Sequence, residues 1–428
     1  MIYTFNGYDL NDEANGLKVL KSNLSKMAKQ YTNSYKLVRS NGAKFTGSTV
    51  GEKPLTIEGY ISKTTVADLQ IKCDELVLKL SAKEKNLDIT YAGATRRFVA
   101  TLNNLVITQN GTYATWSAEF LCYEAFGKDT AATDLACKNA AVTTATYNSN
   151  ETFGGTANAK PVITLDFAFI EPTWISKYLE FLNTSLSKRL RITRQWATFD
   201  KISFDCNARK VTLYPATRSV IDSCDVITGW TSSHTLSLEA VNMKEGVGAL
   251  KGVMAGADAA LTFSKLNFTP TIDLSSAVGT IFIPVFIPTP TSGTVASIDL
   301  LIGSDATLAN NYCYYRKTTK WDGTALTANA WNWIAIDLSA APTATTGAPN
   351  RALIKSIQVA LNATATVQLN GAFVDVIAVF KTNPIGQSID FEGNFPEYEA
   401  GAGIISLADE FTARKYTITT ANYLKRYL

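Results

Sequence analysis

Histidine is nearly absent from this chain, which has one in 428 residues. That residue, His234, lies in a Thr- and Ser-rich segment and is expected to be a solvated loop residue. Zinc sites of the HExxH kind and Ser-His-Asp or Cys-His catalysis each need at least one well-placed histidine, and most need more. The sequence also lacks a CxxC pair and a Gly-rich phosphate loop. Composition therefore argues against most metalloenzymes, triad hydrolases and nucleotide-binding enzymes.

The chain also has a small net charge and lacks long apolar runs. Charged residues make up 18% of the chain and the net charge is +3, so bulk electrostatics give no reason to expect a sequence-specific nucleic-acid partner. The chain has no apolar run of about 18 residues, which predicts no membrane span. Residues 1–15 lack the pattern of a secretory signal. The six scattered cysteines are expected to be buried free thiols of a protein made in a reducing cytoplasm.

The residues that are plentiful, Thr, Asn, Ala and Ser, favour β-rich domains with polar loops. A chain of this length has room for about three domains of roughly 150 residues each. Within residues 1–130, Thr65 and Asp68 resemble a capping box, and apolar residues follow at helical spacing. The spacing predicts one amphipathic helix over 64–81, packed across a sheet in an α+β unit.

The remaining chain reads as strands with one interruption in the middle. Residues 131–159 have few large apolar groups and are expected to be a linker or arm. Residues 160–215 and 384–428 look like two halves of one β domain, with a helix at 174–182. Residues 216–383 differ in character and are expected to be a second domain inserted into the first.

Several segments, taken in order, resemble the distal tail protein family of long-tailed bacteriophages. In the N-terminal region they are Ile57-Glu-Gly-Tyr-Ile, the helix from Asp68, Leu87-Asp-Ile-Thr-Tyr, Arg97-Phe-Val-Ala-Thr-Leu and Ala118-Glu-Phe-Leu-Cys. Further on they are Pro161-Val-Ile-Thr-Leu, Ile202-Ser-Phe-Asp, Gly393-Asn-Phe-Pro and the ending Tyr423-Leu-Lys-Arg-Tyr-Leu. The resemblance covers residues before Tyr214 and after Ile385, so the family pattern stops and resumes around the proposed insertion.

The resemblance implies a mainly β protein of the virion, located at the distal end of the tail. The N-terminal domain would form a homohexameric ring, called the belt, and a galectin-like β-sandwich would project from it. The implied partners are the tail tube protein, the tail hub protein and a receptor-binding protein. No enzymatic activity is implied.

The inserted region resembles a galactose-binding-like jelly roll, a fold of carbohydrate-binding modules. The segments that carry this resemblance include Asp225-Val-Ile-Thr-Gly-Trp, Lys244-Glu-Gly-Val-Gly and Trp331-Asn-Trp-Ile-Ala-Ile-Asp. Aromatic rings stack on sugar rings while neighbouring polar groups bind the hydroxyls. Tyr312, Tyr314 and Arg316 would share one face of a strand, and Trp321 follows, so these four residues are the candidate site for a host cell-surface glycan. The alternative is that half of the tyrosines belong to the core.

Glu245 and Asp375 are candidate ligands of a calcium ion, because similar jelly rolls often bind calcium near their first and last strands. Calcium takes six to eight oxygen ligands, so two carboxylates would need backbone carbonyls beside them. Ordinary surface carboxylates are the alternative. No other cofactor is expected.

Two other classes of function remain open. In the first, the protein is a free lectin-like protein whose working part is residues 160–428. In the second, it is a polysaccharide-degrading enzyme that uses two carboxylates.

Overall fold

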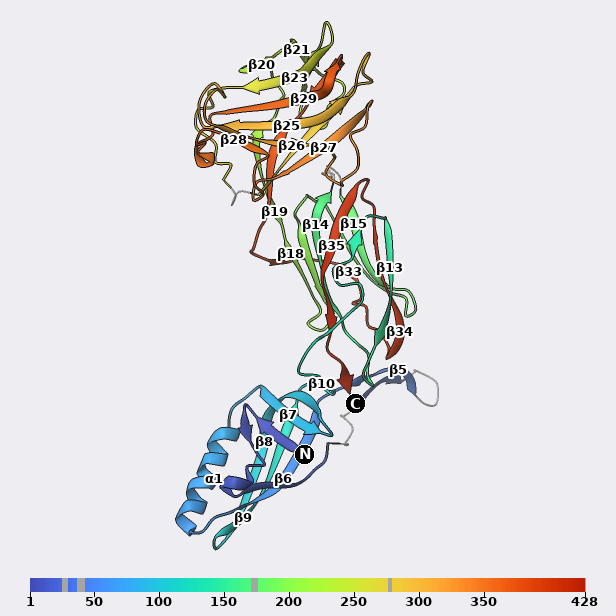
Figure 1. Cartoon of the computed structure of the whole chain (residues 1–428). Coiled ribbons are helices and arrows are strands. Elements are labelled where there is room, and N and C mark those ends of the chain that lie inside the picture. The colour runs from blue at the N-terminus through green and yellow to red at the C-terminus, as the bar shows by residue number, and fades with distance from the viewer. Residues whose placement is uncertain (25–29, 37–42, 171–175, 276–278, 428) are drawn as a thin grey trace.

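The computed structural model describes residues 1–24, 30–36, 43–170, 176–275 and 279–427, with the backbone alone for residues 30–36 and 43–50. The chain forms three β-rich bodies that follow one another along an elongated molecule (Figure 1). The expected mainly β fold class is confirmed. No helix within these ranges is long and apolar enough to cross a membrane.

The N-terminal domain is a twisted nine-stranded sheet with one helix packed on it. Its strands are β1 (Ile2–Phe5), β2 (Tyr8–Asp9), β3 (Leu17–Ser22), β6 (Lys53–Ser62), β7 (Lys85–Tyr91), β8 (Ala94–Asn110), β9 (Tyr113–Cys122), β10 (Gly127–Lys128) and β36 (Arg426–Tyr427). A short 3-10 helix η1 (Glu13–Asn15) precedes β3, and β4 (Gln30–Lys36) pairs with β5 (Ala43–Val50) in a separate ribbon. Strand β6 alternates buried and half-exposed residues along its length, as expected for a sheet with one covered face.

Helix α1 (Val66–Leu80) forms where the capping box predicts it. The Thr65 hydroxyl accepts a hydrogen bond from the Asp68 amide at 3.1 Å and donates to the Asp68 carboxylate at 2.7 Å. These bonds satisfy polar groups that the first turn of a helix leaves free. Leu69, Cys73 and Leu76 then pack into the core between the helix and the sheet.

The second domain is a sandwich of two antiparallel sheets. The first contains β11 (Thr133–Asp134), β12 (Ala141–Val142), β14 (Val162–Ile170), β17 (Lys201–Asp205), β18 (Lys210–Tyr214), β32 (Gln387–Ser388) and β35 (Arg414–Tyr423). The second contains β13 (Thr146–Phe153), β15 (Lys177–Asn183), β16 (Lys188–Arg194), β33 (Glu392–Gly393) and β34 (Gly401–Asp409). In both sheets, strands from before and after the central domain lie side by side, and the two sheets share one apolar core.

The structure refines two expectations for this region. Residues 131–159, expected to be a linker or arm, form strands of the second domain, because β11 and β12 pair with β35 and β13 pairs with β34 over eight residues. The helix expected at 174–182 is replaced by strand β15 within the described residues, whereas Trp174 itself lies outside them. For residues 131–159 the partner strands are distant in the sequence, whereas β15 pairs with its hairpin neighbour β16 over seven residues and with the distant β34 over four.

The central domain is a second sandwich, and all of its strands come from residues 216–382. Its seven-stranded sheet contains β19 (Ala216–Asp222), β21 (Thr235–Glu239), β22 (Ala249–Val253), β24 (Thr280–Ile287), β27 (Ala330–Asp337), β30 (Asn370–Val374) and β31 (Ile377–Thr382). Its six-stranded sheet contains β20 (Trp230–Ser232), β23 (Asp258–Lys265), β25 (Val295–Gly303), β26 (Tyr312–Lys317), β28 (Ala344–Thr346) and β29 (Ser356–Val367), and a 3-10 helix η2 (Arg351–Leu353) precedes β29.

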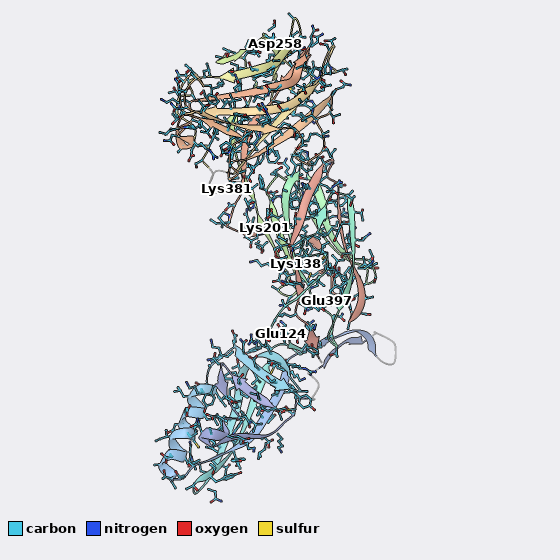
Figure 2. The ribbon with its side chains drawn as sticks, viewed as in Figure 1. Glu124, Lys138, Lys201, Asp258, Lys381 and Glu397 are labelled. Atoms are coloured by element: carbon cyan, nitrogen blue, oxygen red, sulfur yellow. The ribbon has the colours of Figure 1, made fainter. Side chains whose placement is uncertain are left out.

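The central domain begins and ends at the same place. Its first strand β19 pairs antiparallel with its last strand β31, and Ala216 lies opposite Thr382. Figure 2 shows Lys381 at the boundary with the second domain and Asp258 at the far end of the molecule. The two connections to the second domain therefore lie side by side.

Candidate functional site

Three of the four predicted glycan-binding residues lie together on the outer face of the six-stranded sheet. Cys313 and Tyr315 of β26 point into the apolar core of the central domain. Because side chains alternate along a strand, Tyr312, Tyr314 and Arg316 occupy the opposite face. The two tyrosines are half-buried and the arginine is exposed. The sequence-based expectation that these three share a face holds in the structure.

The charge of Arg316 is balanced by a carboxylate that sequence reasoning missed. Asp299, on the neighbouring strand β25, is only 5% exposed and accepts two parallel hydrogen bonds from Arg316, from Nε at 3.0 Å and from an Nη at 2.8 Å. The hydrogen bonds and the charge of Asp299 raise the pKa of Arg316. The guanidinium also lies 5.6 Å from the centre of the Tyr314 ring. This forked pair fixes the orientation of the arginine.

Trp321 lies elsewhere, at the junction between the central and second domains. Its ring stacks on Phe169 of β14, with ring centres 3.8 Å apart. Both belong to the junction cluster, whose members are Phe169, Phe199, Phe282, Trp321, Trp333, Ala335, Val376, Ala378, Phe380 and Ala413. Residues of both domains contribute, so the cluster fixes one sandwich against the other. The structure does not place Trp321 beside Tyr314.

The two predicted calcium ligands are engaged by other partners. Glu245 accepts two hydrogen bonds from the guanidinium of Arg218, at 2.8 and 2.5 Å. Asp375 is fully buried and accepts from the amides of Lys244, Glu245 and Val376. Burial raises the pKa of Asp375, and these amide bonds oppose that rise. Within the ranges that the structure describes, no group of three or more His, Cys, Asp or Glu residues could hold a metal ion. Glu245 and Asp375 do not fit a shared calcium site as they stand.

The end of the chain forms a second junction, between the N-terminal and second domains. Strand β36 pairs with β10, which pairs in turn with β8 of the N-terminal sheet. Arg426 is 9% exposed, donates to the Asn158 carbonyl at 3.1 Å and lies 4.5 Å from the centre of the Phe126 ring. Burial lowers the pKa of Arg426.

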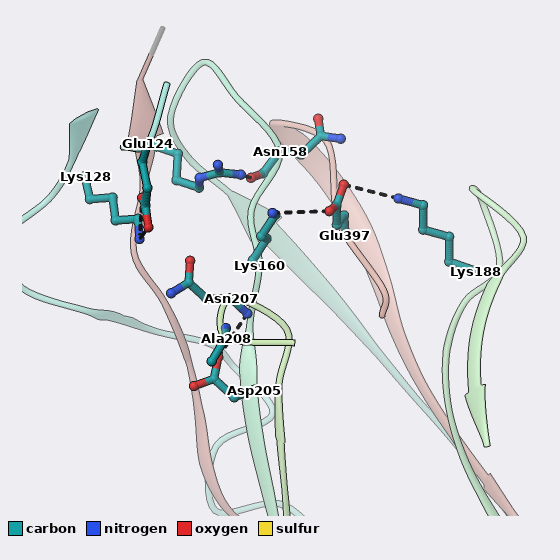
Figure 3. A network of polar contacts seen from close by, with 10 residues as sticks. Glu124, Lys128, Asn158, Lys160, Lys188, Asp205, Asn207, Ala208 and Glu397 are labelled. Carbon is teal, nitrogen blue, oxygen red and sulfur yellow. Dashed lines mark hydrogen bonds and ion pairs between the residues drawn. The ribbon is translucent and has the colours of Figure 1, made fainter. Parts of the chain in front are cut away.

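A carboxylate beside this junction is held by two lysines (Figure 3). Glu397 lies 3.5 Å from Lys160 and 3.1 Å from Lys188. Burial alone would raise the pKa of Glu397, but the hydrogen bond from Lys188 and the two positive charges hold it below its ordinary value. The contacts join three segments that are far apart in the sequence.

Comparison with known families identifies the N-terminal part of the chain. Residues 5–122 match the family model of the phage tail protein RIFT-related domain. The N-terminal domain is a phage tail domain. For residues 5–122, this match confirms the resemblance to tail proteins of long-tailed phages that the sequence predicts.

No curated protein sequence matches this chain. Among solved structures, the Dit protein of phage SPP1 is 14% identical, covering 50% of this chain and 82% of its own length with a TM-score of 0.36. An infectious bursal disease virus structure (Gx strain) is 14% identical over 79% of this chain and 80% of its own, with a TM-score of 0.18. An exo-β-1,3-galactanase from Phanerochaete chrysosporium is 8% identical over 75% and 78%, with a TM-score of 0.20. These similarities are too low to carry an argument about function.

Proposed function

We propose that this tail protein forms a homohexameric ring at the distal end of the tail, between the tail tube and the hub. The observation that carries the proposal is the phage tail domain at residues 5–122. The tail tube protein, the hub protein and a receptor-binding protein are its proposed partners. The protein acts as a connector and an adhesin in this proposal, without a catalytic step.

A closed ring needs two different complementary surfaces on each subunit. Helix α1 offers an uncovered apolar surface for one of them. Ile71 and Leu78, two turns apart on one face, are 66% and 71% exposed, and Val77 beside them is 48% exposed. Exposed apolar groups gathered in this way favour contact with another protein surface. We assign this face of α1 to the contact with the next subunit.

Electron microscopy of isolated tails tests the ring directly. The expected image is a six-fold ring at the tail tip, labelled by an antibody against this chain. Replacing Ile71 and Leu78 together by lysine should prevent ring assembly, whereas Lys79→Gln on the same helix should not. Label along the tail shaft, or a tip without a ring, would contradict the proposal.

We further propose that the central domain attaches the tail to a host cell-surface glycan through Tyr312, Tyr314 and Arg316. Two aromatic side chains and a fixed guanidinium on one face match the combination that sugar sites use. Six copies on one ring would multiply weak single contacts, by about 10²–10⁴ in favourable geometry. The entry and exit strands β19 and β31 pair with each other, which supports an inserted adhesion domain on a tail scaffold.

Binding of the fluorescently labelled full-length protein to host cells tests this adhesion. Tyr312→Ala combined with Tyr314→Ala should reduce binding strongly while the melting temperature stays near that of the wild type. Release of reducing ends from host polysaccharide would instead favour the enzyme class. A protein that binds cells but is absent from virions would favour the free lectin.

A further inference from the structure

The outer face of the six-stranded sheet is polar far beyond the three residues already discussed. The inward side chains of β23, β25, β26 and β29 belong to the apolar core. Most of the alternate positions carry hydroxyl, amide or charged groups, whereas Ala260, Leu301 and Ala360 are apolar. The polar residues are Thr262, Ser264, Ser297, Asp299, Arg316, Gln358 and Asn362. Ser264, Ser297 and Asp299 are 8%, 4% and 5% exposed although they lie on the outside of the sandwich. We call the polar residues of this face, several of them buried, the polar floor.

Strand register places these groups in rows across four strands. Ser264 of β23 lies opposite Gln358 of β29. Gln358 lies opposite Leu301 of β25, which lies opposite Tyr314 of β26. In Figure 1 these strands run side by side in the domain that is most distant from the N-terminus. Three inter-strand spacings of about 4.8 Å give a row of about 14 Å, which suits an oligosaccharide rather than a single sugar ring.

Hydrogen bonds within the floor hold the side chains in place. Gln358 Nε2 donates to Ser264 Oγ at 2.7 Å, and Ser297 Oγ donates to Asp299 Oδ1 at 3.3 Å. An amide side chain has two donor hydrogens and one acceptor oxygen, so Gln358 and Asn362 each keep hydrogen-bonding capacity for a ligand. Side chains held in this way lose little entropy when a ligand binds.

The charge of the floor is zero. Among the seven polar residues named above, Arg316 and Asp299 carry the charges, and they form the forked ion pair described above. Lys265 of β23 and Lys317 of β26 lie at the other set of positions of their strands, opposite Ile357 and Ile298. Recognition of a phosphate or carboxylate polymer needs cations that are free to pair with it. A neutral surface of hydroxyls, amides and tyrosine rings suits the hydroxyls and C–H faces of an uncharged sugar.

We propose that this floor binds a chain of an uncharged glycan and discriminates against polyanionic wall polymers. The inference rests on the proposed adhesive function and names its ligand class. Tyr312 and Tyr314 supply the stacking surface at one side, and Gln358, Asn362 and Ser264 bind hydroxyls across the floor. Asp299 acts as a specificity residue, because it neutralises the one cation on the face.

The experiment measures binding of the full-length protein to two kinds of probe. One is an array of uncharged gluco-, galacto- and rhamno-oligosaccharides, and the other is poly(glycerol phosphate). The variants are Gln358→Ala, Asn362→Ala and the isosteric Asp299→Asn, with Gln368→Ala as the matched control. Gln368 follows the end of β29, and its side chain contacts the Ala255 carbonyl instead.

The wild type should bind uncharged oligosaccharides in preference to poly(glycerol phosphate). Gln358→Ala and Asn362→Ala should each weaken that binding about tenfold, the effect of one lost hydrogen bond, and Gln368→Ala should not. Asp299→Asn should increase binding to poly(glycerol phosphate), because it leaves Arg316 unpaired. A role of Asp299 in folding alone would not produce this gain.

Three results would overturn the inference. Preference of the wild type for poly(glycerol phosphate) would contradict the neutral-ligand class and leave adhesion intact. Unchanged oligosaccharide binding in both amide variants would show that the ligand lies elsewhere. Binding to cells without binding to any oligosaccharide on the array would also contradict the inference, whereas loss of binding to both cells and array would contradict adhesion itself.

Discussion

At the scale of single residues, Trp321 shows how an aromatic side chain can be conspicuous in sequence and yet serve a junction. Its ring stacks on Phe169 across the boundary of two domains. We expect Trp321→Ala to destabilise the contact between the central and second domains by about 2 kcal/mol, because the half-buried ring is lost. Small-angle scattering should show a broader distribution of shapes, and glycan binding should persist. Trp331→Ala is the matched control, because Trp331 packs on Phe286 and Phe373 outside the junction cluster. Loss of glycan binding in Trp321→Ala, with binding retained in Trp331→Ala, would show that Trp321 belongs to the binding site.

Glu397 should make the stability of the folded protein depend on pH. Its pKa is lowered in the folded protein, so its ionised form stabilises the fold at pH values above the ordinary glutamate pKa of 4.5. That contribution declines as the pH falls below this value and is lost below the lowered pKa. Wild type should therefore exceed Glu397→Gln in stability by about 1 kcal/mol at pH 7, and the two should converge in acid. Denaturant unfolding at several pH values measures the difference, with the exposed Glu399→Gln as control. A difference that is constant with pH would exclude this charge effect.

At the scale of elements, those formed by local interactions could be predicted from the sequence, and those that depend on distant partners could not. Helix α1 was predictable because its cap and its apolar spacing are local. Strands β11, β12 and β13 were not, because few apolar residues mark them and the paired residues of β34 and β35 lie 248 to 290 positions further along the chain. That Tyr312, Tyr314 and Arg316 share one face could be predicted from the alternation of side chains along a strand. That Asp299 lies beside Arg316 could not, because this depends on the register between β25 and β26. The polar residues at alternate positions of β25 and β29 were the sequence signal from which the polar face around these three residues could have been predicted.

The C-terminal strand is the element that joins the N-terminal domain to the sandwich. Arg426→Ala removes the contacts with Asn158 and Phe126 and should weaken this junction by about 2 kcal/mol. Limited proteolysis should then cleave the chain faster between residues 129 and 132, the connection between β10 and β11, and the products should remain folded domains. Lys381→Ala, which removes a positive charge at the other junction, should leave that cleavage rate unchanged. Equal rates in wild type and Arg426→Ala would show that β36 does not hold the two domains together.

The loop at residues 243–248 gives a second prediction at this scale. Because Glu245 is paired with Arg218 and Asp375 accepts three amide bonds, millimolar calcium should leave the melting temperature of the protein unchanged relative to a chelator. Differential scanning calorimetry measures it. A calcium-dependent rise that Asp375→Asn abolishes would instead establish the calcium site that the sequence suggested.

At the scale of the whole molecule, the paired strands β19 and β31 suggest that the central domain can be removed. Thr217 and Lys381 lie opposite each other, so deleting residues 218–380 and joining these two through a short Gly-Ser turn should preserve both sandwich sheets. The deletion uncovers Phe169, which the junction cluster buries, and Phe169→Ser should be combined with it to keep the product soluble. The shortened protein should fold, form the same ring in electron micrographs and fail to bind host cells. An insoluble product, or a folded one that no longer assembles, would show that the central domain is part of the scaffold.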